Sequence, residues 1–418
     1  MALAQALATR GSRRAVLALV LAIAAAADGR TASAVPRIGA LIPAGSHAAA
    51  SVARARPRAT AAPDSSTAPG VSDRALVGTL DVSALGMGTL NWPLDKRSDP
   101  SAAAALAASL RAGVDLVDTA EAYGFGRSEE LVKDCLAKAG AVAGGSADTA
   151  AGRVVAVASK FAPVPWRRSR EDVVAACRAS ARRLGVASLD LYQIHFPDVL
   201  QPLSALGIEE VKNEIYWQGL ADCYELGLAR NVGVSNYGPK LLARCEAALG
   251  ARGVPLASNQ INYSLLYRKQ GAQATVDYCA ARGIAVLGYF PLANGLLAGA
   301  YGPGRLPAGL KGRSMRKYVE GGLTDRGVTY PAGGAEPLLV EMRRVAGARG
   351  KTVAQVALNY VVCKGVIPIP GCRNAKMAED NAGALGWRLD AGEVAALEAA
   401  ADALGFEFSG GGFGLVED

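Results

Sequence analysis

The chain has 418 residues, about half of them hydrophobic and a fifth charged, which is enough apolar material for one large globular domain or two smaller ones. Its formal charge of +8 comes mostly from residues 1–70, which contain eight arginines, no lysine and only two acidic residues. The remaining 37 basic and 35 acidic residues nearly balance, which argues against nucleic acid or a membrane surface as a partner of the folded part.

The N-terminal region has the composition of a targeting sequence. Three arginines precede an apolar run at 15–27 that is too short to span a bilayer, and small residues follow it. We therefore expect residues 1–34 to be a signal peptide and residues 35–72 to be a transit peptide or disordered leader. This bipartite pattern favours the plastid (chloroplast) stroma. The alternatives are secretion, a mitochondrial location, and a disordered tail that carries no targeting signal.

Seven cysteines are spread along the body of the chain. They form no CxxC pair and have no histidine nearby to complete a metal site. We expect free thiols in a reducing compartment and no bound metal, which weighs against secretion.

From residue 85 onward, short apolar or β-branched runs alternate with longer helical stretches, as in a parallel sheet with crossover helices. The expected strands cover residues 85–90, 114–117, 153–158, 189–194, 231–234, 257–261, 284–289 and 366–369. A helix is expected at 170–184, where apolar residues recur at helical spacing and Gly185 follows.

Eight strands over roughly 300 residues favour closure into a (β/α)8 TIM barrel, which we assign to residues 73–418. A β-hairpin over 75–82 is expected across the barrel floor. The longest irregular stretch, at 293–334, is rich in Gly, Pro and Arg and follows the seventh strand, where a lid or binding loop is expected.

Potentially charged side chains close three successive strands. Asp118 ends the second strand, Lys160 the third and His195 the fourth, and Tyr123 lies in the loop just after Asp118. Because reactive groups of such barrels gather at the C-terminal ends of the strands, we expect all four to face one cavity.

This set of residues suits proton transfer. An ammonium beside a phenol favours the phenolate, so Lys160 would make Tyr123 a better acid, and Asp118 would keep Lys160 protonated. His195 can hydrogen-bond a substrate oxygen or pass a proton to Tyr123. Taken singly, each residue also has a purely structural explanation. Asp118 can cap a helix or form a salt bridge, and His195 can be a hydrogen-bonded imidazole in the core. Lys160 and Tyr123 can lie on a solvated rim or pack in the core.

Several motifs, in order and with barrel spacing, resemble the aldo-keto reductases. They are Gly-Val-Asp-Leu-Val-Asp-Thr-Ala-Glu-Ala-Tyr-Gly at 113–124, Ala-Ser-Lys at 158–160, Asp-Leu-Tyr-Gln-Ile-His at 190–195, Gly-Val-Ser-Asn at 233–236 and Ile-Pro-Ile-Pro-Gly at 367–371. The likeness runs from about residue 76 to residue 403. The plant and algal plastid members are the most similar in pattern, sharing Pro-Trp-Arg at 165–167 and Ser-Asn-Gln-Ile-Asn-Tyr-Ser-Leu at 258–265.

The resemblance implies a role for each residue of the set. Tyr123 would be the general acid, Lys160 and Asp118 its tuning pair, and His195 the group that orients the substrate. The implied cofactor is NADPH, bound extended across the barrel mouth without a Gly-rich dinucleotide fold. The residues implied to bind it are Thr89, Ser235, Asn236, Gln260, Tyr289, Pro291, Leu292, Gly295, Arg373, Lys376 and Asn381.

Specificity for the phosphorylated cofactor depends on the segment after the last strand. Arg373 and Lys376 precede or begin a helix whose N-terminal amides can receive the 2′-phosphate. Met377 stands where many relatives have Gln or Arg, so use of NADH stays open. An ordinary solvated helix start is the alternative for Arg373 and Lys376.

The expected function is reduction of a small aldehyde or ketone to the alcohol, by a monomer or weak homo-oligomer. A pyridoxal reductase would be the same chemistry with a narrower substrate. An NADPH-binding sensor or auxiliary subunit with little turnover is the alternative. The aromatic residues that form either a substrate pocket or plain packing are Trp92, Trp166, Phe196 and Trp217.

Overall fold

The computed structural model describes residues 73–92, 100–144, 153–164, 166–198, 212–302, 304–307, 309–323, 329–408 and 415–416. The expected signal and transit segments lie outside these residues. Within them, eight parallel strands pair side by side in chain order. They are β3 Met87–Gly88, β4 Leu116–Asp118, β6 Arg153–Phe161, β7 Leu189–Ile194, β8 Ala229–Ser235, β9 Leu256–Asn262, β10 Ala285–Tyr289 and β13 Val366–Pro368.

The first and last strands close the sheet into a barrel. The backbone N–H of Gly86 donates to Pro368 O, and that of Gly88 donates to Pro370 O, each over 2.9 Å. A Cβ on Gly88 would lie 2.9 Å from Ile369 O, so the two strands approach this closely only because the residue is glycine. The expected (β/α)8 barrel is confirmed, although its first strand is much shorter than the predicted 85–90.

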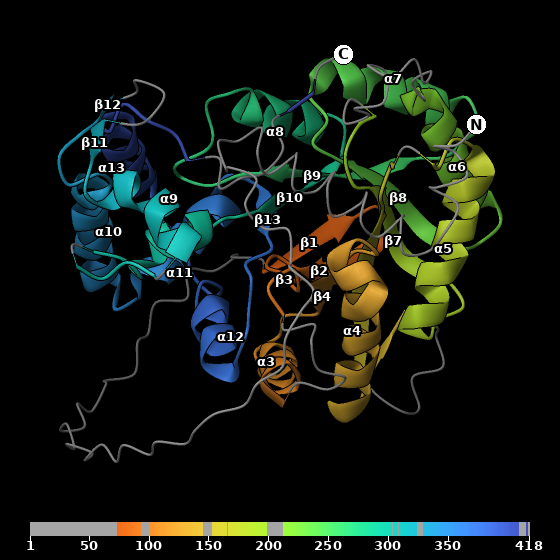
Figure 1. The fold of residues 1–418 in the computed structure, drawn as a ribbon, viewed down its shortest axis with the longest axis horizontal. Helices are drawn as coiled ribbons and strands as arrows, with labels where there is room; N and C mark the ends of the chain where they lie inside the picture. Colours follow the sequence, from red (N-terminus) through yellow and green to blue (C-terminus); the bar gives the residue numbers. More distant parts are fainter. Residues whose placement is uncertain are drawn as a thin grey trace, which may run out of the picture.

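Helices surround the strands, as Figure 1 shows in a view with the strands at the centre. In chain order they are α3 Pro100–Arg111, α4 Arg127–Lys138, α5 Arg170–Leu184, α6 Asn213–Glu225, α7 Pro239–Gly250, α8 Ala272–Ala280, α9 Gly309–Val319, α10 Glu336–Arg349, α11 Val353–Cys363, α12 Ala375–Ala382 and α13 Ala391–Asp402. The bounds of α5 match the prediction. Ser169 and Asp172 form a capping box at its start, and Gly185 ends it with a φ of 73°.

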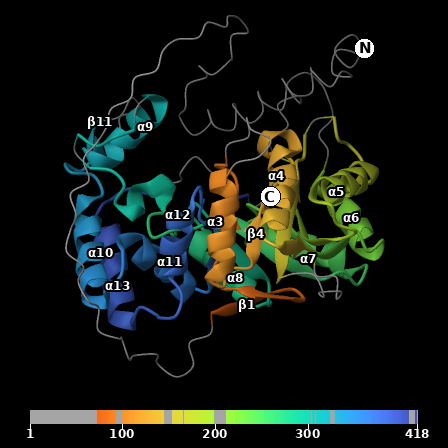
Figure 2. The ribbon, with the colours of Figure 1, turned by 90° about the horizontal axis from the view of Figure 1, so that it is seen from below.

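A hairpin of β1 Arg74–Val77 and β2 Leu80–Ser83 covers the floor of the barrel, as predicted. Val77 and Val82 pack against the cluster of aliphatic side chains inside the barrel. The backbone N–H of Thr79 donates to Asn231 Oδ1 over 2.9 Å. In Figure 2 the hairpin lies at one end of the barrel and α9 at the other.

The stretch at 293–334 is more regular than we predicted. It contains the 3-10 helix η3 Ala293–Ala298, helix α9, and the short antiparallel strands β11 Gly322–Leu323 and β12 Thr329–Tyr330. The prediction was wrong here because Gly, Pro and Arg dominate the composition and conceal the apolar face of α9. On that face Met315, Tyr318 and Val319 are buried.

A short strand, β5 Ala141–Ala143, pairs with β6 outside the barrel path. All seven cysteines are free thiols, as expected. Of the helices in the described ranges, none is both long enough and apolar enough to cross a bilayer.

Candidate active site

Lys160 and Asp118 form a buried ion pair at the C-terminal ends of two adjacent strands. Lys160 Nζ donates to Asp118 Oδ2 over 2.6 Å and to Thr119 O over 2.9 Å. The other carboxylate oxygen, Oδ1, accepts from Gln260 Nε2 over 2.7 Å. Burial lowers the pKa of Lys160, and the charge of Asp118 opposes this shift. Asp118 therefore favours the protonated lysine, as the sequence suggested.

Tyr123 lies against this pair. It begins the short 3-10 helix η1 Tyr123–Gly126, and Lys160 Nζ lies 5.2 Å from the centre of its ring. The His195 ring meets the Tyr123 ring edge-on, with 5.7 Å between centroids and 72° between planes. The structure thus brings together all four residues expected to share a cavity.

The pKa of Tyr123 is raised well above 10.0, first by burial and then by the negative charge of Asp118 and the neighbouring Tyr289. This direction is opposite to the one expected from the sequence. Loss of water around the phenol is the largest cause, and the negative charge of Asp118 adds to it. Tyr123 is therefore a protonated phenol, which is the form that a proton donor needs.

His195 follows β7 directly and is neutral near physiological pH. Burial, and then the positive charge of Lys160, hold its pKa well below 6.5. Its Nδ1 atom is buried and has no hydrogen-bond partner among the described residues. A proton on Nδ1 would be an unsatisfied buried donor, so we assign the proton to Nε2.

A group of polar residues beside His195 is held by mutual hydrogen bonds. Asn236, with a φ of 68°, donates from Nδ2 to Ser235 Oγ over 3.0 Å and to His195 O over 3.2 Å. Its Oδ1 accepts from the Tyr289 hydroxyl over 2.7 Å. Ser235 Oγ donates to Gln260 O over 2.7 Å. The ends of β8, β9 and β10 thus carry one fixed polar surface next to the catalytic set.

The loop after β10 has an unusual backbone. Phe290, Ala293 and Asn294 have φ between 47° and 57°, and Gly295 has a φ of 100°. L-residues rarely adopt such values, and clusters of them occur at binding sites. Pro291 and Leu292, expected to line the pyrophosphate, lie within this strained turn.

Thr89, expected near the ribose, is fully buried, and its hydroxyl is already engaged. Oγ1 donates to Asp118 O over 3.0 Å and lies 2.8 Å from Ser128 Oγ. Ser128 also accepts from Thr119 Oγ1 over 2.8 Å. Thr89 therefore supports the strand end that carries Asp118.

Sequence reasoning missed Ser128 and its neighbour Glu129. Glu129 is buried and accepts from Ser159 Oγ over 2.6 Å and from Arg183 Nε over 2.5 Å. Burial raises its pKa. Their place in the first turn of α4, directly after the Tyr123 loop, is the signal that could have identified them.

The residues expected to select the 2′-phosphate lie at the start of α12. Arg373 and Lys376 are both exposed to solvent. Asn374 caps the helix, and its side chain accepts from the backbone N–H of Met377 over 2.9 Å. Asn381, expected to contact the adenine, is buried near the end of the same helix. Two exposed cationic side chains thus flank this helix start.

The four candidate pocket aromatics do not share one environment. Trp92 is buried and donates from Nε1 to Cys372 O over 2.6 Å, and Phe196 packs 5.5 Å from the His195 ring. Trp166 packs against the small cluster of Ala122, Ala162 and Val164. Trp217 is buried in α6 and donates to the Tyr237 hydroxyl over 3.1 Å. Trp217 is therefore core packing, whereas the other three lie near the catalytic residues or the strand ends.

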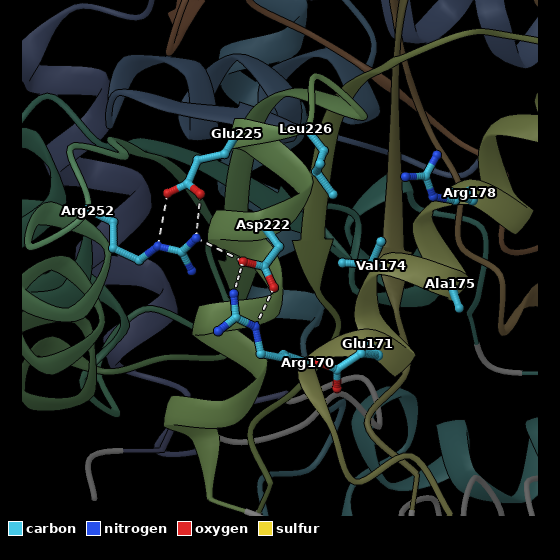
Figure 3. A pocket seen from close by; sticks show the side chains of 9 residues that line it. All are labelled: Arg170, Glu171, Val174, Ala175, Arg178, Asp222, Glu225, Leu226 and Arg252. Atoms are coloured by element: carbon cyan, nitrogen blue, oxygen red, sulfur yellow. Dashed lines mark hydrogen bonds and ion pairs between the residues drawn. The ribbon is translucent and has the colours of Figure 1, made fainter.

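A cavity of about 580 Å³ lies elsewhere, between α5, α6 and the end of α7. Figure 3 shows that Asp222 pairs there with both Arg170 and Arg252. None of the four catalytic candidates lines it. The candidate active site is therefore identified by the polar side chains that converge at the strand ends, and not by the size of a cavity. In the described ranges no group of three or more His, Cys, Asp or Glu side chains is placed to hold a metal ion.

Comparison with known proteins agrees with this geometry. Residues 84–402 match the model of the aldo/keto reductase family. The chain is 37% identical over 335 residues to the chloroplastic pyridoxal reductase of Arabidopsis thaliana, covering 78% of this chain and 85% of the relative.

Solved structures have the same fold. A Bombyx mori aldo-keto reductase in complex with NADP is 25% identical, with a TM-score of 0.55, over 78% of this chain and 91% of the other. The glycerol dehydrogenase of Gluconobacter oxydans, at 22% identity, has a TM-score of 0.62 over 79% and 96% of the two chains. The chain therefore belongs to the aldo-keto reductase family and is an oxidoreductase.

Proposed function

We propose that the protein reduces an aldehyde or ketone to the alcohol with NADPH, and that Tyr123 donates the proton. The observation that carries this proposal is that the Tyr123 ring contacts both Lys160 Nζ, 5.2 Å from its centre, and the His195 ring, with 5.7 Å between centroids. Three strand ends and one loop supply the four residues, as the mouth of a catalytic barrel requires.

The residues of this chain fit a nicotinamide dinucleotide. Ser235, Asn236 and Tyr289 form a fixed polar surface beside His195 on which a carboxamide can hydrogen-bond. The strained turn after β10 and the exposed cations Arg373 and Lys376 extend this surface toward the phosphates. When bound, the reduced nicotinamide supplies a hydride from C4 to the carbonyl carbon.

The protein groups act on the carbonyl oxygen. His195, neutral and protonated on Nε2, donates a hydrogen bond that orients the oxygen. As the hydride adds to carbon, the Tyr123 hydroxyl gives its proton to the oxygen, and the product is the alcohol. The negative charge left on the phenolate is stabilised by Lys160, which Asp118 keeps protonated.

An intact set of four residues favours turnover over the alternative of an auxiliary subunit that only holds NADPH. Pyridoxal is the first aldehyde to test, because the Arabidopsis relative at 37% identity carries the name pyridoxal reductase. The full chain should oxidise NADPH in the presence of pyridoxal or of another member of a panel of aldehydes and ketones. Bound NADPH that no carbonyl compound oxidises would instead support the auxiliary subunit.

We also propose a plastid location. The Arabidopsis relative is named as chloroplastic, and residues 1–72 have the composition of a signal followed by a transit peptide. Residues 1–72 fused to a fluorescent protein should direct it into the plastid of an alga or plant cell. Secretion of the fusion, or retention in the cytosol, would contradict this location.

A further inference from the structure

The segment after α13 returns to the barrel mouth at two points. We call residues 403–408 and 415–416, the parts of it that the structure describes, the tail. Leu415 and Val416 are partly buried against the main hydrophobic core. Their contacts lie on the strand ends that carry the proposed cofactor surface.

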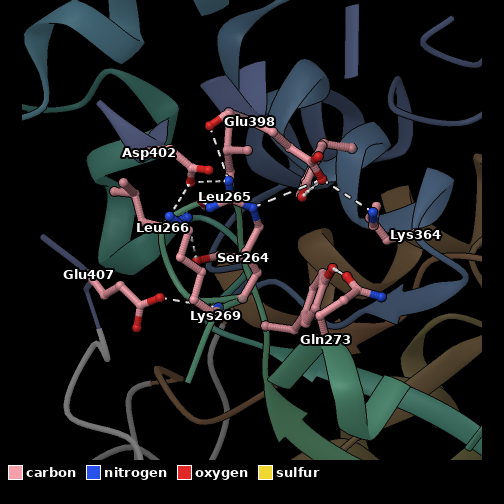
Figure 4. A network of polar contacts seen from close by, with 12 residues as sticks. Ser264, Leu265, Leu266, Lys269, Gln273, Lys364, Glu398, Asp402 and Glu407 are labelled. Atoms are coloured by element: carbon pink, nitrogen blue, oxygen red, sulfur yellow. Dashed lines mark hydrogen bonds and ion pairs between the residues drawn. The ribbon is translucent and has the colours of Figure 1, made fainter. Parts of the chain in front are cut away.

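The first contact fixes the beginning of the tail on the loop after β9. Figure 4 shows this network. Lys269 Nζ pairs with Asp402 over 2.9 Å, and its backbone N–H donates to Glu407 Oε1 over 3.1 Å. The backbone N–H of Phe408 donates to Leu266 O over 2.9 Å. One ion pair to the end of α13 and two hydrogen bonds to the tail itself therefore hold it on the loop after β9.

The second contact is a backbone bridge to the segment after β8. The N–H of Val416 donates to Asn236 O over 3.0 Å, and the N–H of Gly238 donates to Val416 O over 2.7 Å. Val416 thus pairs with Tyr237 in a parallel bridge. Both hydrogen bonds act on peptide groups on either side of Tyr237.

Asn236 is the residue that this bridge affects most. Its backbone has a φ of 68°, a left-handed value that few L-residues adopt, although asparagine tolerates it better than most. Its side chain links Ser235, the backbone of His195 and the Tyr289 hydroxyl. A hydrogen bond to the carbonyl of Asn236 therefore helps to orient the centre of the polar surface.

We infer that Val416 is a positioning residue for the cofactor site. By holding the Asn236 peptide, the tail keeps the Asn236 side chain ready for the carboxamide of a nicotinamide dinucleotide. The inference rests on the proposed use of NADPH. It assigns to the tail an effect on cofactor binding and not on the chemical step.

The test compares two substitutions in the full chain. Val416→Pro removes the N–H that donates to Asn236, whereas Val416→Ala keeps it. We expect Val416→Pro to raise the Kd and the KM for NADPH about 3–10-fold, as for the loss of one hydrogen bond, with kcat unchanged. The conservative Val416→Ala is expected to bind NADPH as the unsubstituted chain does. Amide hydrogen exchange at Gly238 should be faster in Val416→Pro only.

The outcomes separate the two proposals. Equal Kd values for Val416→Pro and the unsubstituted chain would overturn the positioning role and leave the proposed function intact. An unchanged exchange rate at Gly238 in Val416→Pro would show that losing the Val416 N–H does not loosen this segment, which also overturns the positioning role. If the unsubstituted chain binds no NADPH, this result contradicts the proposed function. It then also contradicts the positioning role, which depends on NADPH binding.

Discussion

Lys160 and Asp118 form an ion pair with 2.6 Å between Nζ and Oδ2, and their side chains are 0% and 3% exposed. Two charges removed from water are stable together only because each has further partners, here Thr119 O and Gln260 Nε2. Removing one charge leaves the other buried and unpaired.

Lys160→Met should therefore lower the free energy of unfolding by about 3–5 kcal/mol. The double variant Asp118→Asn with Lys160→Met should lose less than the sum of the two single variants, since it contains neither charge. Urea unfolding of the three variants measures the coupling. Losses that simply add would show that the two side chains do not stabilise each other.

The low pKa of His195 predicts a specific pH dependence of stability. Below pH 6.5 the unfolded chain binds a proton at this imidazole that the folded chain does not, so stability falls as the pH drops below that value. His195→Gln removes this proton uptake. Its unfolding midpoint in urea should fall less than that of the unsubstituted chain between neutral pH and about pH 5. Parallel pH curves for the two proteins would contradict the assignment of a neutral, buried histidine.

The exposed side chains of Arg373 and Lys376 at the start of α12 predict a preference for NADPH over NADH. Arg373→Gln and Lys376→Gln should each raise the Kd for NADPH about tenfold, because each removes a charged hydrogen-bond donor to a phosphate. The Kd for NADH, which lacks the 2′-phosphate, should not change. Arg344→Gln on α10, which removes an exposed arginine paired with Glu341, is the matched control. Equal effects on the two cofactors would place the 2′-phosphate elsewhere.

Local signals and barrel geometry predicted much of this structure. Helix α5 could be placed because its apolar residues recur at helical spacing and Gly185 ends it. Asp118, Lys160 and His195 could be brought together because parallel strands of a barrel end at one mouth. These inferences need only the chain order and the side-chain types.

Other features depend on packing that the sequence does not display. The pKa of Tyr123 rises first because the phenol is buried, and burial is a property of the folded state. Val416 meets Asn236 across a long separation in sequence, with backbone atoms that leave no side-chain pattern. Helix α9 is concealed by a Gly- and Arg-rich composition. Long-range contacts and burial are therefore what the sequence could not supply.

The most direct measurement of the proposed chemistry is single-turnover oxidation of bound NADPH by a carbonyl substrate in Tyr123→Phe. Tyr192→Phe is the matched control, because the Tyr192 hydroxyl is buried, far along the chain from the loop of Tyr123, and has no hydrogen-bond partner among the described residues. If Tyr123 is the proton donor, Tyr123→Phe should bind NADPH normally and lose about 10²–10⁴-fold in rate, while Tyr192→Phe keeps its rate. Equal rates for Tyr123→Phe and the unsubstituted chain would contradict the role of Tyr123.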